Sequence, residues 1–60
     1  NNLNGSEEAV RRRWGLILDY FGSVYFLSGD REKAKICYEL ASEVLPDDEA
    51  ISSNLKRVQS

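Results

Sequence analysis

Few side chains in this sequence are of the types that carry out chemistry. Glu39 and Glu43 stand one helical turn apart, a spacing at which two carboxylates can share a proton or a cation. The 60 residues contain no His and a single Cys, so the usual zinc ligand sets and Cys–His or Ser–His pairs cannot be built. We therefore interpret the two glutamates as a solvated helix edge, and we expect no catalysis, no metal and no other cofactor.

A run of three arginines, Arg11 to Arg13, is the feature that would suggest nucleic-acid binding. Glu7 and Glu8 precede Arg11 and Arg12 by four residues, the order in which an acidic and a basic side chain stabilise a helix. The formal net charge is −2, whereas general nucleic-acid binders carry a basic excess. We expect a solvated helix surface here and no nucleic-acid partner.

Cys37 has no second thiol with which to form an intramolecular disulfide. A secreted domain of this size normally needs several disulfides, so the sequence predicts an intracellular protein of the cytoplasm or nucleus, with Cys37 packed as a small hydrophobic residue.

The longest apolar-rich stretch, Trp14 to Leu27, includes Asp19 and is too short and too polar to cross a bilayer, so no membrane partner is expected. Because the chain does not begin with Met, we expect it to be a segment of a longer protein.

The positions of helix-ending and helix-starting residues predict an all-α chain of three helices. Gly29 would end the first helix and Asp30 would cap the second. Pro46 would end the second helix, and Asp47 or Asp48 would cap the third. The predicted segments are a flexible lead-in over 1–5 and a single helical domain over 6–60, with helices at about 6–28, 31–45 and 48–58, the first two antiparallel.

The first predicted helix is apolar over more than half of its circumference. On a helical wheel one stripe contains Trp14, Ile17, Leu18, Phe21, Val24 and Tyr25, and the stripe beside it contains Leu16, Tyr20 and Leu27. We expect the first stripe to form the core, and the width of the apolar surface predicts at least two packing partners. Gly15 and Gly22 lie on a third sector, where close approach of another helix would offset their cost in a helix interior.

Small and large residues recur at fixed spacing through the middle of the chain. They are Gly22, Tyr25, Gly29, Ala34, Ala41 and Pro46, with Leu18, Phe21 and Tyr38 at further bulky positions. This pattern resembles a tetratricopeptide repeat (TPR), a helix–turn–helix unit of about 34 residues, although Arg31 and Ser42 depart from it. The resemblance covers Gly15 to Asp48. It implies a TPR-like antiparallel helical hairpin followed by a third, capping helix, in a non-catalytic scaffold that binds a protein or peptide.

The segment from Ala34 to Ala41 is also similar to the second helix of half-a-TPR repeats, which occur in RNA-processing scaffolds. The first predicted helix instead carries the ordinary TPR spacing of Gly22 and Tyr25. The alternative function is therefore an RNA-processing scaffold element that contacts RNA or an RNA-bound protein. Salt-sensitive binding to RNA would support this alternative.

The TPR resemblance also implies a ligand groove on the first helix. By matching spacing, its partner-binding positions are Leu16, Asp19, Ser23, Phe26 and Leu27. On the wheel, Asp19, Ser23 and Phe26 share a sector away from the first stripe, which agrees with an exposed groove. One TPR subfamily grips the terminal carboxylate of heat-shock chaperones with a Lys and an Asn. Because this chain has Asp19 and Ser23 at those positions, that activity is not expected.

A single repeat of this kind cannot bury its apolar face alone. The predicted third helix offers only a narrow stripe, formed by Ile51, Leu55 and Val58. The side chains expected to remain for self-association are Trp14, Leu16, Tyr20 and Leu27. We therefore expect a symmetric homodimer through the first helix, or packing against neighbouring repeats in a longer protein.

Overall fold

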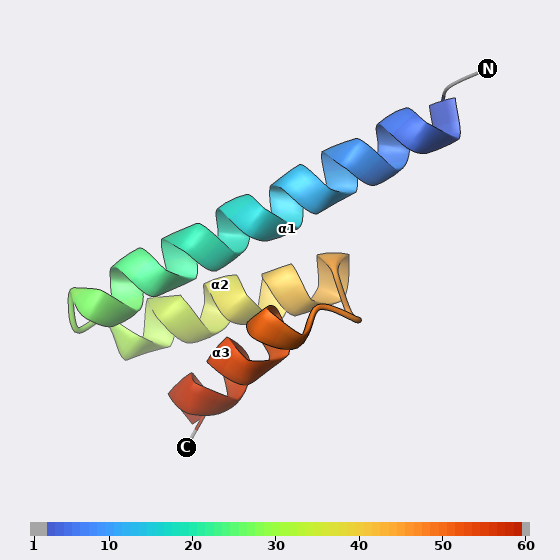
Figure 1. Ribbon diagram of the computed structural model, residues 1–60. Helices are drawn as coiled ribbons and strands as arrows, with labels where there is room; N and C mark the ends of the chain where they lie inside the picture. Colours follow the sequence, from blue (N-terminus) through green and yellow to red (C-terminus); the bar gives the residue numbers. More distant parts are fainter. Residues whose placement is uncertain (1–2, 60) are drawn as a thin grey trace.

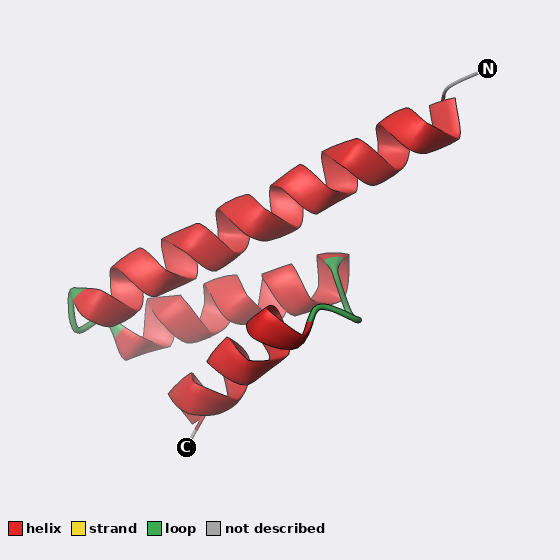
Figure 2. Cartoon of the chain, in the orientation of Figure 1, coloured by secondary structure: helices red, strands yellow, loops and turns green. Residues whose placement is uncertain are grey.

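The computed structural model describes residues 3–59, which form three α-helices (Figure 1). The helices are α1 (Leu3–Leu27), α2 (Arg31–Val44) and α3 (Glu49–Gln59). α1 and α2 lie side by side and antiparallel, and α3 turns back to pack mainly against α2 (Figures 1 and 2). No strand occurs within residues 3–59. The predicted all-α fold, a helical hairpin followed by a third helix, is confirmed.

The turn between α1 and α2 follows from Gly29 and Asp30. Gly29 has a φ of +93°, a left-handed conformation that glycine adopts without steric cost. The N–H of Gly29 donates to the carbonyl of Phe26 (3.1 Å) and the N–H of Asp30 donates to that of Tyr25 (2.9 Å), the two bonds of a Schellman motif. Asp30 then caps α2 by accepting from the N–H of Lys33 at 3.0 Å. The predicted stop-and-start signal is confirmed.

The turn between α2 and α3 is built on Pro46 and Asp48. Pro46 cannot continue α2, and the N–H of Asp48 donates to the carbonyl of Leu45 at 3.2 Å. The side chain of Asp48 accepts from the N–H of Ile51 at 3.1 Å, so Asp48 rather than Asp47 caps α3. α2 and α3 each agree with their predicted ranges to within one residue at either end.

α1 begins at Leu3, three residues before its predicted start, and so takes in part of the segment expected to be a flexible lead-in. Extending a helix that has already nucleated costs little, and Asn4 and Gly5 do not prevent it. Residues 1 and 2, the rest of the predicted lead-in, lie outside the described range. At 1.5 Å per residue α1 is about 37 Å long and α2 about 21 Å, so α1 extends well past the end of α2.

α1 packs against α2 through its glycines. Gly15 and Gly22 are both buried, Gly15 against the side chain of Leu45 and Gly22 against the ring of Tyr38. A Cβ atom at Gly22 would lie only 2.6 Å from the Tyr38 ring. The close helix approach predicted for these two glycines is confirmed.

The expectation that the first apolar stripe of α1 forms the core is largely wrong. Leu18 and Tyr25 are half-buried, whereas the other four members are exposed: Trp14, Ile17, Phe21 and Val24. The physical reason is that the bulky Tyr38 and Leu45 side chains of α2 fit only where α1 has no side chain. This fit turns the glycine sector inward and the larger apolar residues outward.

The core is built mainly by α2 and α3. Its buried residues are Ala34, Tyr38 and Ala41 of α2 and Ile51 and Val58 of α3. Tyr25 and Phe26 of α1 and Leu55 of α3 are half-buried around the cluster of Ala34, Tyr38 and Val58. α3 therefore covers one side of the α1–α2 hairpin.

The two glycine contacts predict unequal effects of the same substitution. We expect Gly22→Ala to lower the free energy of unfolding by about 1–3 kcal/mol, because the Tyr38 ring is buried and cannot move aside. Gly15→Ala should cost less, because the half-buried Leu45 side chain can rotate and alanine favours the helix. Urea unfolding followed by circular dichroism at one protein concentration measures both. Equal losses for the two variants would contradict this account of the packing.

Candidate functional site

The candidate site is the outer surface of α1. Eight of its apolar side chains are exposed, namely Val10, Trp14, Leu16, Ile17, Tyr20, Phe21, Val24 and Leu27. Between Arg13 and Ser28 the only charged residue is Asp19, and that side chain is half-buried on the opposite side of the helix. Monomeric proteins rarely expose a contiguous apolar area of this extent without a function for it.

α2 continues this apolar surface on one side of the hairpin. Trp14 lies across a shallow depression from Val44 and Pro46, and the ammonium of Lys33 lies 5.7 Å from the centroid of the half-buried Tyr25 ring. Leu40 of α2 is also exposed. We name this surface, made of the outer side of α1 and the adjoining edge of α2, the open face. It lies on the side of the hairpin away from α3.

The other side of α1 faces α3, and three of the predicted groove residues lie there. The Nδ2 group of Asn54 in α3 donates to the carboxylate of Asp19 at 2.9 Å. The hydroxyls of Ser23 and Tyr38 are hydrogen-bonded at 2.9 Å, and Phe26 packs against the core. The three side chains expected in an exposed groove, Asp19, Ser23 and Phe26, are therefore half-buried, because α2 and α3 already engage them.

The remaining predicted site residues are exposed. Leu16, from the predicted groove, and Leu27, which is 85% exposed, lie at the edge of the outer surface. Trp14 and Tyr20, which were predicted for self-association together with Leu16 and Leu27, are exposed too. Four further exposed residues were not predicted: Ile17, Phe21 and Val24 were expected in the core, and Val10 was not singled out. The signal that could have found them is the glycine pair on the other side of α1, which marks the packed face.

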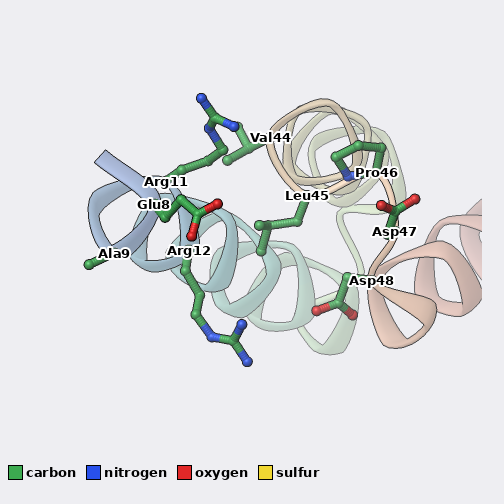
Figure 3. Close-up of a pocket in the computed structure, with 9 residues that line it drawn as sticks. All are labelled: Glu8, Ala9, Arg11, Arg12, Val44, Leu45, Pro46, Asp47 and Asp48. Atoms are coloured by element: carbon green, nitrogen blue, oxygen red, sulfur yellow. The ribbon is translucent and has the colours of Figure 1, made fainter. Parts of the chain in front are cut away.

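The projecting part of α1 forms an open notch with the α2–α3 corner (Figure 3). The notch has a volume of about 700 Å³ and is lined by Glu8, Ala9, Arg11, Arg12, Val44, Leu45, Pro46, Asp47 and Asp48. Leu45 projects toward α1, where it covers Gly15. Basic and acidic side chains are mixed around the notch, where Arg11 and Arg12 lie near Glu8, Asp47 and Asp48.

The chemistry available on the described residues is limited. Cys37 is half-buried, and burial raises the pKa of its thiol above the ordinary value, which lowers the fraction of reactive thiolate at neutral pH. Within residues 3–59, His, Cys, Asp and Glu side chains form no group of three that could hold a metal ion. Over the same residues, no helix has both the length and the apolar character needed to cross a membrane.

Comparison with known proteins identifies no family. The chain has no significant match among protein-family models, curated proteins or solved structures. The function of the chain is therefore inferred from the geometry of its own residues.

Neighbouring residues at the end of α1 provide a test of the two sides of the helix. Phe26→Ala should lower the free energy of unfolding by about 2 kcal/mol, because it removes a half-buried ring from the core cluster. Leu27→Ala should change it by less than about 0.5 kcal/mol, because that side chain is exposed. Thermal and urea unfolding measure both effects. A Phe26→Ala variant as stable as Leu27→Ala would place Phe26 outside the core.

The raised pKa of Cys37 predicts slow thiol chemistry. Near neutral pH we expect iodoacetamide to alkylate Cys37 several-fold more slowly than a cysteine in an unstructured peptide, because the thiolate is the reacting species. The rate should rise with pH through the raised pKa, and the difference should vanish in concentrated urea. Mass spectrometry of timed samples gives the rates. Alkylation as fast as that of the peptide under native conditions would contradict this prediction.

Proposed function

We propose that this chain is a non-catalytic protein-interaction or assembly module that docks another protein chain on its open face. The observation that carries the proposal is the arc of exposed apolar side chains along α1, which contains no charged residue from Trp14 to Leu27 apart from the inward Asp19. Phe21 and Trp14 are each about half exposed, so a partner that covers either one completely stabilises the complex by roughly 1 kcal/mol. This stabilisation is gained only when a partner removes these side chains from water.

The arrangement of the hairpin supports a TPR-type scaffold as the kind of module. Ala34 and Ala41 are fully buried, and Gly22 admits the Tyr38 ring, as small residues must where two helices approach closely. Gly29 and Pro46 lie in the turns that end α1 and α2. α3 covers one side of the hairpin and leaves the other side for a partner, so the docking surface differs from the groove first expected at Asp19, Ser23 and Phe26.

A binding role also suits the side chains that are present. The chain has no His, and burial raises the pKa of its only thiol, so neither a His-activated nucleophile nor a reactive thiolate is available. An apolar surface bordered by charged residues such as Arg13 and Lys33 is typical of protein interfaces, whose centre is apolar and whose rim is polar.

Site-specific photo-crosslinking tests this function. With benzoylphenylalanine in place of Phe21, on the open face, we expect a covalent adduct with a protein chain in the cells where the chain is made. The matched control carries the same group in place of Glu39, which is exposed on the polar side of α2, and should give no adduct. Mass spectrometry identifies the partner, and a second substitution, Ile17→Asp, should abolish the adduct. If Phe21 and Glu39 positions behave alike, the proposed function is wrong.

A further inference from the structure

The exposed residues of α1 include a regular seam. Val10, Trp14, Ile17, Phe21 and Val24 follow one another at alternating intervals of four and three residues, and all five are between 43% and 57% exposed. We name these five residues the α1 seam. Alternating spacing of four and three is the pattern by which one helix packs along another in a coiled coil. α2 and α3 pack on other sides of α1, so the seam has no partner helix among the described residues.

We infer that the α1 seam is the interface between two copies of this chain, packed as an antiparallel pair of α1 helices. The inference rests on the proposed function, in which the open face docks a protein chain, and it identifies that chain as a second copy of the same protein. Three observations carry it: the sizes of the seam residues, the position of the charges, and the extent of the exposed area.

The sizes of the side chains match an antiparallel pair. Let the two helices run in opposite directions, with the two-fold axis crossing the seam at the level of residue 19 along the helix. Trp14 of one copy then lies level with Val24 of the other, and Ile17 lies level with Phe21. Both of these layers then combine an aromatic with a β-branched side chain, which fills space without overpacking, while Val10 lies level with Ser28, just past the end of the partner helix. A parallel pair would instead place Trp14 against Trp14 and Phe21 against Phe21, which crowds two layers and leaves the others underfilled.

The charges favour the same orientation. Within the basic run, Arg11 and Arg13 flank the seam near one end, and both side chains are exposed. A parallel pair brings the two basic runs together, and like charges at close range repel each other. An antiparallel pair separates them to opposite ends. Near the two-fold axis, the seam is flanked by Leu18 on one side and Tyr20 on the other. Neither residue is charged, so each can approach the same residue of the second copy without repulsion.

The exposed area supports a stable pair. The five seam residues, with Tyr20 and Leu27 beside them, expose several hundred Å² per copy, toward the roughly 800 Å² that one partner contributes to a standard-size interface. The same surface on both copies is what a two-fold symmetric interface requires, and such dimers are the commonest closed assembly.

Sedimentation equilibrium over a range of concentrations tests the pairing. We expect the unaltered chain to show the mass of a dimer, and Phe21→Glu to raise the dissociation constant by at least about 100-fold, because both copies lose an apolar contact. The matched control is Ile36→Glu, which places the same charge at a similarly exposed apolar residue on α2, nearly opposite the buried Tyr38. It should leave the dissociation constant within about threefold. Circular dichroism checks that both variants remain helical, and Ile17→Ser provides a milder second seam variant.

Spin-label distances test the orientation without altering the seam. In a Cys37→Ala background, Glu8→Cys places one label near the exposed start of α1 in each copy. An antiparallel pair offsets the two labels by about 33 Å along the helix axis, whereas a parallel pair places them level with no axial offset, so the label-to-label distance is clearly shorter. Double electron–electron resonance distinguishes the two values. The short distance would overturn the antiparallel arrangement.

The outcomes separate this inference from the proposed function. A single-chain mass at all concentrations overturns self-pairing. If photo-crosslinking from position Phe21 then yields an adduct with a different protein, the open face is still a docking surface and only the identity of the partner is wrong. An adduct between two copies, together with a dimer mass that Phe21→Glu abolishes, supports the inference.

Discussion

The contact between the Tyr38 ring and Gly22 is the constraint on which the rest of the structure depends. Tyr38 is 3% exposed, and its hydroxyl is hydrogen-bonded to that of Ser23. The ring occupies the space that any side chain at Gly22 would need, so it fixes both the distance between α1 and α2 and the rotation of α1 about its axis. Once that rotation is fixed, Asp19 and Phe26 face α3, and the large apolar residues of α1 face outward.

The two sides of the hairpin differ as a result. On one side, α3 completes a core with Ile51 and Val58 and forms a polar contact from Asn54 to Asp19. On the other side, no element within residues 3–59 covers the seam. A chain with so few buried side chains has a small reserve of stability. The apolar area that α1 leaves exposed is therefore large relative to the core that holds the hairpin together.

The order of the helices was predictable because their ends are encoded locally. Gly29 with Asp30, and Pro46 with Asp48, act through backbone conformation and capping bonds that involve only neighbouring residues. The inward side of α1 was not predictable in the same way. A helical wheel ranks the sides of α1 by hydrophobicity. In the fold, the side that packs inward is the one where glycines leave room for the large Tyr38 and Leu45 side chains of α2. The exposure of Leu16, Tyr20 and Leu27 was predicted, whereas Trp14 had been assigned both to the core stripe and to self-association. The burial of Asp19, Ser23 and Phe26 depends on where α3 lies, which the residues of α1 do not encode.

The unequal lengths of α1 and α2 have a thermodynamic consequence. The start of α1 projects beyond the end of α2 (Figure 1), and a helical segment without a neighbouring helix relies on local propensity, which is marginal for short stretches in water. A partner that covered Val10 would therefore also stabilise the helical turns around it, and the stability of this segment would then be coupled to docking. The entropy lost on ordering opposes association, which makes the complex weaker and more readily reversible than its contact area suggests. Substitutions before Arg11 that raise or lower helix propensity would then tune affinity from outside the contact itself.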